Sequence, residues 1–276
     1  MSSEPSTVWP EDKKITLTDN VTIDYLVYQG HELSITAGYP TAYPQNAPDF
    51  SYSHNVKNDA SNTGPYFLDD LISLSVTPPN HLDFDDWSLI SGNLKGNIPS
   101  TSSSDIQIES DVTLRANFSF KLYSFTIVQG ANGNTSGSTN NGSYNAFQDI
   151  TLKANANSNF QFSKWEYEVS ANNWQDFNAS ASDTITLIGD TKIRPVFIGT
   201  PYTLTIIIND SSWGSAAGAG TYLYNEVANI AATPNQGYKF TRWSVTSGTT
   251  PTNFNSNEQN QSVNILGDTT IELYLE

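Results

Sequence analysis

Apolar and polar residues alternate in short stretches along this chain, and one such stretch recurs at a fixed interval. Its apolar positions are two residues apart, and the stretch occurs three times at a constant period of 78. The three sets are Ile72, Leu74 and Val76; Ile150, Leu152 and Ala154; and Ala228, Ile230 and Ala232. A period of two is typical of a strand with one buried face. The pattern therefore predicts a repeated, strand-rich protein.

Tryptophans follow the same long period downstream of these strands. Trp87, Trp165 and Trp243 share it and end the stretches "VTPPNHLDFDDW", "ANANSNFQFSKW" and "ATPNQGYKFTRW". A phenylalanine lies three residues before each tryptophan, and a leucine or a further aromatic residue lies two before that. Because a unit of this size has a limited core, large rings are well suited to fill it. We predict that nine side chains form the repeat core: Leu82, Phe84, Trp87, Phe160, Phe162, Trp165, Tyr238, Phe240 and Trp243.

Each copy ends in a predicted hairpin. The stretches "IQIESDVTLRANF", "TITLIGDTKIRPVFI" and "SVNILGDTTIELYLE" place a Ser-Asp or Gly-Asp turn between two alternating runs. Asp190 and Asp268 keep the period of the tryptophans, whereas Asp111 and Asp190 are one residue further apart. The second copy therefore has one extra residue, which we place in the loop after Trp165.

These landmarks predict five segments along the chain. They are an N-terminal arm (1–14), the closing hairpin of a truncated repeat (15–30) and three repeats (31–119, 120–199 and 200–276). The first repeat opens with a hairpin about 13 residues longer than the others, and Glu32 falls at the position of Tyr123 and Tyr202.

The third copy resembles the divergent InlB B-repeat family of bacterial surface proteins. It has the family's G-x-Y strand, its T-P-x-x-G-Y-x-F-x-x-W motif and its G-D-x-x hairpin, in "GTYLYNEVANIAATPNQGYKFTRW" and "SVNILGDTTIELYLE". The second copy has Asn155-Ala156-Asn157 in place of Thr-Pro-Asn, and the first has His81-Leu82 in place of Gly-Tyr. The resemblance covers about residues 31–276 and implies small β-grasp-like units of the kind strung into rods on cell surfaces.

Periodicity and resemblance together predict a mainly β fold with very little helix. The expected architecture is a tandem array of three small β-grasp-like or β-sandwich repeats of about 78 residues.

Composition and charge exclude several classes of partner and site. The chain has 28 acidic and 12 basic residues, a formal net charge of −16, which repels phosphate backbones and anionic membranes. It has no cysteine, so disulfides and thiolate metal sites are excluded. The start "MSSEPSTVWPEDKK" lacks the features of a Sec signal, and no apolar run is long enough to span a bilayer. We expect no nucleic acid partner, no membrane insertion, and a location on a virion surface or a bacterial cell surface.

Candidate chemistry is sparse. His31, His54 and His81 could join Asp83, Asp85 and Asp86 in a metal site, but their spacing matches no common ligand pattern, so we expect solvated loop residues. A G-x-S-x-G elbow is absent, and the glycine-rich stretch "GANGNTSGSTNNGS" has no Gly-Lys-Ser/Thr. We interpret that stretch as a flexible polar loop. The sequence predicts no catalytic residue, metal or cofactor, and hence no enzyme.

Aromatic residues outside the repeat register are the best candidates for contact with a ligand or partner, because a ring offers a large area at low entropic cost. Trp9, Trp174 and Trp213 are out of register, and the first hairpin is rich in rings. The candidate contacts are Trp174, Trp213, Tyr39, Tyr43, Phe50 and Tyr52. Alternatively, Trp174 and Trp213 cover the sides of their own repeats.

Two functions fit these observations. The first is a non-enzymatic structural or display protein, a short β-repeat rod on a larger assembly such as a phage virion, where it would be a capsid decoration, fibre or spike. Its protein partners would bind the N-terminal arm and the first hairpin. The second is the repeat region of a bacterial cell-surface adhesin, acting as a spacer or binding a surface glycan or protein.

Overall fold

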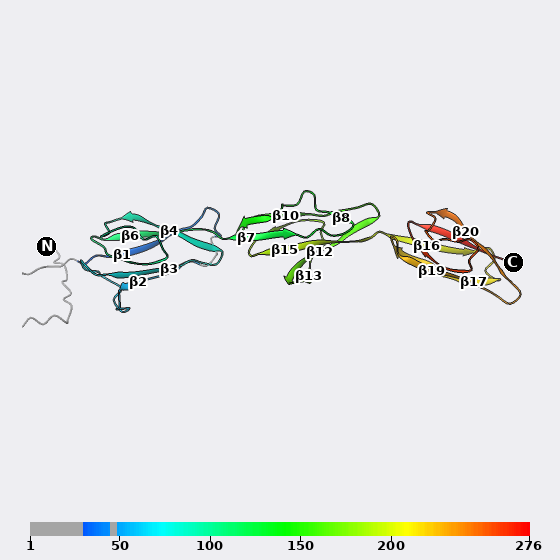
Figure 1. The fold of residues 1–276 in the computed structure, drawn as a ribbon, viewed down its shortest axis with the longest axis horizontal. Coiled ribbons are helices and arrows are strands. Elements are labelled where there is room, and N and C mark those ends of the chain that lie inside the picture. Colours follow the sequence, from blue (N-terminus) through cyan, green and yellow to red (C-terminus); the bar gives the residue numbers. More distant parts are fainter. Residues whose placement is uncertain (1–29, 45–48) are drawn as a thin grey trace, which may run out of the picture. The chain divides into compact units, whose positions relative to one another are not determined.

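A computed structural model of the chain describes residues 30–44 and 49–276, which form 22 strands and no helix (Figure 1). The prediction of a mainly β repeat protein is confirmed. The predicted arm, its Trp9, and all but the last residue of the predicted truncated hairpin lie outside the described residues. Two compact units share the chain: one holds most residues up to Phe118, and the other holds residues 119–276 with two short segments, 40–44 and 80–83.

The first group of strands forms two three-stranded sheets. The strands are β1 (Leu33–Gly38), β2 (Ser51–Val56), β3 (Ile72–Thr77), β4 (Leu82–Ser91), β5 (Ser103–Ile106) and β6 (Val112–Phe120). One sheet has the order β1-β6-β4 and the other β2-β3-β5. The alternation that predicted a strand at 72–76 is that of β3, whose Ile72, Leu74 and Val76 are buried.

The second group contains a strand that the others lack. Its members are β7 (Leu122–Ile127), β8 (Gly133–Asn134), β9 (Gly142–Asn145), β10 (Asp149–Lys153), β11 (Asn155–Ala156), β12 (Phe160–Ser170), β13 (Asn173–Asn178), β14 (Ser182–Thr186) and β15 (Thr191–Gly199). The main sheet has the order β13-β12-β15-β7-β9, and the opposite layer is formed by the pairs β10-β14 and β11-β8. β13 extends the main sheet by one antiparallel strand.

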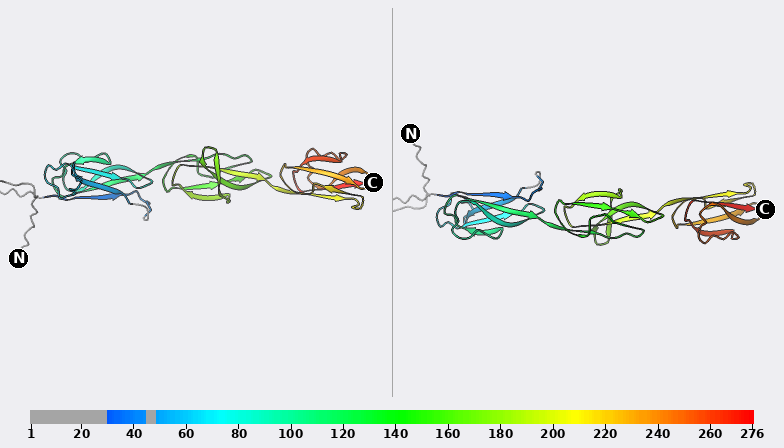
Figure 2. Two further views of the ribbon diagram at one scale, coloured as in Figure 1. Left: turned by 90° about the horizontal axis from the view of Figure 1, so that it is seen from below. Right: turned by 90° about the horizontal axis from the view of Figure 1, so that it is seen from above.

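The third group forms two sheets. It comprises β16 (Pro201–Ile208), β17 (Gly214–Ala217), β18 (Gly220–Leu223), β19 (Val227–Pro234), β20 (Phe240–Gly248), β21 (Asn260–Asn264) and β22 (Thr269–Leu275). The sheets have the orders β18-β16-β22-β20 and β17-β19-β21, and Figure 2 shows this group from two further sides. Its core combines buried residues of both sheets, among them Ile230 of β19 and Leu273 of β22, so the unit is a two-layer sandwich.

In every group the first and last strands run parallel and adjacent, as β1 with β6, β7 with β15, and β16 with β22. The predicted closing segments are not hairpins, because β5, β14 and β21 each pair in one sheet and the following strands β6, β15 and β22 pair in another. The aspartate in the turn between these two strands fixes the parallel pairing. Asp111 Oδ1 accepts a hydrogen bond from the backbone N–H of Glu32 at 3.0 Å, and Asp190 and Asp268 accept the same bond from Ser124 at 2.7 Å and Thr203 at 2.8 Å.

Those bonds align Glu32 with Ser124 and Thr203. Strand pairing agrees, because His31 lies opposite Tyr66 as Tyr123 lies opposite Tyr144. The expected alignment of Glu32 with Tyr123 was therefore wrong by one residue. It was obtained by counting residues from the preceding turns, and such a count does not locate the residue at which the first strand begins.

The repeated tryptophans lie at the centre of each sandwich. Trp87 is 4% exposed, and Trp165 and Trp243 are fully buried. A buried indole N–H requires an acceptor, and in each copy it donates to a backbone carbonyl: Thr101 at 2.9 Å, Ser180 at 3.1 Å and Gln259 at 3.2 Å. The preceding phenylalanines Phe84, Phe162 and Phe240 are half-buried and pack on these indoles with ring centroids 5.5, 5.8 and 6.1 Å away.

The predicted core position five residues before each tryptophan is buried to a different degree in each copy. Leu82 is buried, Phe160 is half-buried and meets Tyr224 edge to face at 5.5 Å, and Tyr238 is 37% exposed and lies outside the core. The position is at the end of the sandwich, so its burial depends on what lies beside it.

Candidate functional site

Three of the candidate rings that the sequence placed in a first hairpin lie together on one side of the first sandwich, although β1 and β2 belong to different sheets and do not pair. Tyr39 stacks on Phe118 with centroids 5.6 Å apart, and Phe50 stacks on Tyr52 at 5.3 Å. Tyr52 pairs with buried Val76 across β2 and β3, so the ring is on the core-facing side of an edge strand, yet it remains 49% exposed. The cluster closes the open side of this sandwich, and part of Tyr52 faces solvent.

A histidine continues this row of rings inward. His54 stacks on Tyr52 with centroids 5.9 Å apart, and its Nδ1 lies 2.6 Å from the hydroxyl of buried Tyr66. Burial lowers the pKa of His54, with Glu32 partly opposing that shift, and burial together with the acidic side chains Glu32 and Asp70 raises the pKa of Tyr66 to about 12. The arrangement therefore favours the neutral forms of both rings.

Tyr43, the fourth candidate of the hairpin, belongs to the other compact unit. Its ring contacts Phe120 at 6.5 Å and Phe147 at 6.1 Å.

Trp174, one of the tryptophans outside the repeat register, lies in strand β13. The guanidinium of Arg194 lies 4.3 Å from the centroid of its ring, and Lys192 Nζ lies at 5.6 Å. Arg194 is held in turn by Glu166, which its Nε and Nη2 reach at 2.8 and 2.7 Å. Both nitrogens reach the same carboxylate oxygen, Oε2, in charge-assisted contacts, so one face of the Trp174 ring covers a charged network on its own repeat.

Glu166 is the centre of that network. Its burial opposes ionisation, but hydrogen bonds from Lys164 and Arg194 outweigh burial and hold the pKa of its carboxyl below the usual range. Lys164 also reaches Asp176 of β13 at 2.5 Å, and Lys192 pairs with Glu168 at 2.8 Å. The ion pairs therefore join the additional strand β13 to the rest of its sheet.

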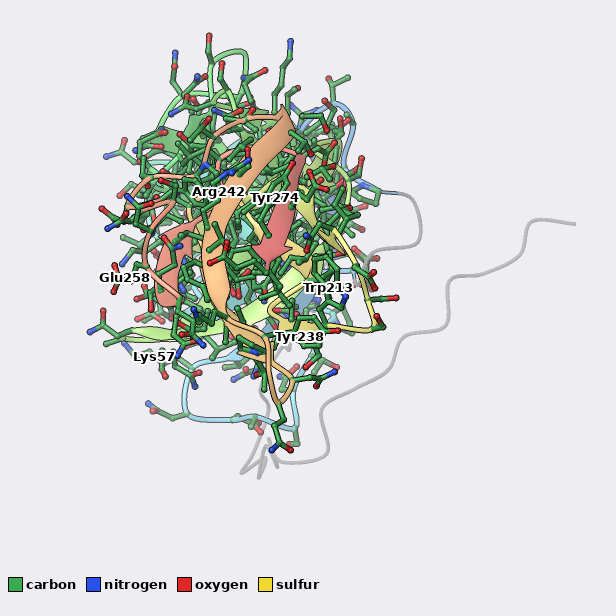
Figure 3. The ribbon with its side chains drawn as sticks, turned by 90° about the vertical axis from the view of Figure 1, so that its right-hand side faces the viewer. Lys57, Trp213, Tyr238, Arg242, Glu258 and Tyr274 are labelled. Carbon is green, nitrogen blue, oxygen red and sulfur yellow. The ribbon has the colours of Figure 1, made fainter. Side chains whose placement is uncertain are left out.

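Trp213 stacks on Tyr238 in the third sandwich, with centroids 5.3 Å apart and an angle of 17° between the rings (Figure 3). Backbone hydrogen bonds from Trp213 to Asp210 and from Asn235 to Trp213 hold the turn that carries it. Trp213 also packs against the buried core of its repeat. Both off-register tryptophans of the described chain thus contact their own repeats, while Tyr238 presents part of its ring to solvent.

In the part of the chain that the structure describes, no group of three histidine, aspartate or glutamate side chains could hold a metal ion. His31 lies 3.6 Å from Asp111, and His81 Nδ1 lies 2.9 Å from the hydroxyl of Tyr123. Asp86 accepts a hydrogen bond from Asn117 at 2.6 Å, and Asp83 lies 4.0 Å from Lys121. Each of these groups has a separate partner on its own surface.

Comparison with known proteins places these repeats in a family. The model of the divergent InlB B-repeat domain matches residues 123–197 and 202–271, more than half of the chain. This chain belongs to the divergent InlB B-repeat family. Domains of that family are typical of bacterial surface and extracellular repeat proteins.

The remaining comparisons add little. No curated protein matches the chain. Among solved structures, the Bacillus anthracis TIE protein matches at 9% identity and a TM-score of 0.31, over 89% of this chain and 50% of that one. The chain thus spans about half the length of that structure.

The second B-repeat contains a solvent-open hollow of about 270 Å³ that sequence reasoning missed. It is lined by Ile127, Gln129, Thr135 and residues 138–141, so every lining side chain except that of Ile127 is polar and uncharged. A smaller hollow of about 150 Å³ in the first repeat lies near Lys95 and Asp105. The hollow in the second repeat is formed by the stretch "GANGNTSGSTNNGS", which was interpreted from the sequence as a flexible polar loop. The difference in length between this loop and its counterpart in the third repeat is a sequence signal that could have indicated the hollow.

Proposed function

We propose that this chain is a non-enzymatic structural and display protein whose B-repeats are exposed on the surface of the bacterium that makes it. The observation that carries the proposal is the shared use of the periodic residues. In each repeat the tryptophan N–H binds a backbone carbonyl inside the core, and the aspartate in the turn before the last strand binds a backbone N–H in or next to the first strand.

The periodic tryptophans and aspartates thus stabilise the fold of all three repeats. An array that uses its repeated side chains for folding can be lengthened or shortened without losing a site, which suits a spacer. The net charge of −16 supports the same role, because like charge keeps an exposed, strand-rich protein soluble and opposes edge-to-edge association.

Fractionation of the producing cells tests the proposal. An antibody raised against the repeats should find the chain in the envelope or the medium, separated from a cytosolic marker enzyme. Recovery only in the cytosol would contradict surface display. Purified phage particles from the same cells should be run on a gel in parallel, since a band of this chain there would move the display site to a virion.

A further inference from the structure

The hollow in the second B-repeat is produced by residues that the third repeat lacks. Gly133 and Gly214 occupy equivalent places opposite Ala156 and Pro234, and Gly142 and Gly220 are equivalent opposite Phe125 and Leu204. Between them, Gly137 and Gly218 share a left-handed backbone, with φ of 91° and 105°.

The segments that follow these two glycines differ in length. Four residues (138–141) separate Gly137 from Gly142, whereas only Ala219 separates Gly218 from Gly220. The second repeat therefore has a local insertion of three residues, and those residues line the hollow.

Hydrogen bonds hold this insertion open between the two sheets. On one side Ser138 Oγ donates to the carbonyl of Lys153 at 2.9 Å and accepts from its N–H at 2.7 Å, and Thr139 Oγ1 accepts from the N–H of Thr151 at 2.9 Å. The segment is thereby fastened to β10. It is not the flexible loop that its composition predicted.

On the other side, Asn141 fastens the insertion to β7. Its Oδ1 accepts from the N–H of Ile127 at 2.7 Å, where a continued β7–β9 ladder would have placed a backbone carbonyl. The main chain consequently leaves β7 at this point, and the buried side chain of Ile127 forms the floor of the hollow.

The remaining hydrogen-bonding capacity faces solvent. Gln129 Nε2 donates to Thr135 Oγ1 at 2.6 Å, which leaves the Gln129 carbonyl oxygen and the Thr135 hydroxyl hydrogen available. Asn140 is exposed, and its side-chain amide has no hydrogen bond within the described residues. Donors and acceptors are thus mixed on the rim, and neither a cation nor an anion lines it.

We propose that this hollow is a binding site for a neutral saccharide, with Gln129, Thr135 and Asn140 bonding its hydroxyl groups. A sugar hydroxyl both donates and accepts, which matches amide and hydroxyl side chains. The volume of about 270 Å³ is slightly below the roughly 300 Å³ at which ligand pockets usually begin, so it suits a single ring. Because Ser138, Thr139 and Asn141 are already fixed, little order has to be imposed on binding.

The negative net charge of the chain also favours uncharged sugars as ligands. With a net charge of −16 and no lining cation, the hollow disfavours sugars that carry a carboxylate or sulfate. The site does not depend on the surface display proposed above, so localisation and sugar binding can each fail without the other.

Titration of the full-length, ¹⁵N-labelled chain tests the proposal. Glucose, galactose and N-acetylglucosamine serve as neutral probes, with glucuronate as the anionic comparison, each to about 50 mM, well above the millimolar Kd that a few hydrogen bonds supply. The neutral sugars should shift the amide signals of residues 127–129 and 135–141, and glucuronate should leave them in place.

Variants localise the effect. The double variant Gln129→Ala with Asn140→Ala should bind the neutral sugars at least about tenfold more weakly, which corresponds to the loss of roughly one or two neutral hydrogen bonds. The control variant Asn173→Ala, on exposed β13, should bind them like the wild type. The proposal is overturned if no neutral sugar shifts these signals, if the shifts lie elsewhere in the chain, if glucuronate acts equally, or if the double variant responds like the wild type.

Discussion

Asp190 accepts two hydrogen bonds from Ser124, one from the backbone N–H at 2.7 Å and one from the hydroxyl at 2.9 Å. The two residues are far apart in the sequence, so the contact joins the turn before the last strand of the second B-repeat to its first strand. These bonds hold the pKa of the Asp190 carboxyl below its usual range.

Asp190→Ala should therefore lower the thermal midpoint of the second repeat at neutral pH. A carboxyl whose pKa is depressed on folding stabilises the protein above its unfolded pKa of about 4, and that contribution disappears as the pH falls through the folded pKa. The gap between variant and wild type should shrink below about pH 4 in calorimetric scans. Glu258→Ala on the exposed surface of the third repeat is the control, and an equal loss there would argue against a specific role for Asp190.

The two tryptophans of the second repeat should respond very differently to truncation. Trp165→Ala removes a fully buried ring and should cost about 3–5 kcal/mol, enough to unfold that repeat. Trp174→Ala removes a half-buried ring over Arg194 and should cost about 1 kcal/mol or less. Urea unfolding followed by circular dichroism measures both, and similar costs would show that Trp174 is part of the core.

Acid should weaken the first repeat through His54. Because burial lowers the pKa of this ring on folding, the neutral form is favoured, and stability is lost as the pH falls below the unfolded value of about 6.5. Hydrogen exchange of the amides of β2 should accelerate between about pH 7 and pH 5, after correction for intrinsic rates. His54→Phe keeps the ring stack and should remove this dependence; if the dependence persists in that variant, another group is responsible.

Glu166 on β12 should contribute to stability because it is the buried centre of the ion-pair network. Glu166→Gln keeps the shape but weakens the bonds to Lys164 and Arg194, and should cost about 1–3 kcal/mol. Denaturant unfolding of the variant, compared with Glu258→Gln, provides the measurement. Equal stability of the two variants would mean that the network around Trp174 contributes nothing.

The features that all three repeats share were predictable, because each repeat fills its core with side chains at the same positions. The constant spacing of Trp87, Trp165 and Trp243 revealed the strands and the buried indoles themselves, but not that the two closing strands of each copy lie in different sheets. Periodicity alone could not distinguish Leu82 from Tyr238, since the first is buried and the second stacks on Trp213, whose place in the equivalent turn of the second repeat is taken by Asn132.

Features confined to one repeat were much harder to predict. β13 gave no periodic pattern, and the contact between Trp174 and Arg194 depends on a strand register that is interrupted by bulges. The hollow likewise depends on which way Asn141 points after the β7–β9 ladder ends. Composition showed that the stretch is polar, but only the hydrogen bonds to β7 and β10 show that it is held in place.

Surface exposure of the B-repeats is the central claim, and labelling of intact cells tests it most directly. A membrane-impermeant amine reagent should modify the chain at Lys57, Lys95 and Lys192, whose side chains are 45, 49 and 44% exposed, while a cytosolic marker protein stays unlabelled. Mass spectrometry of the recovered chain reads out the sites. Surface display predicts labelled lysines before lysis; a chain labelled only after the cells are lysed would contradict it.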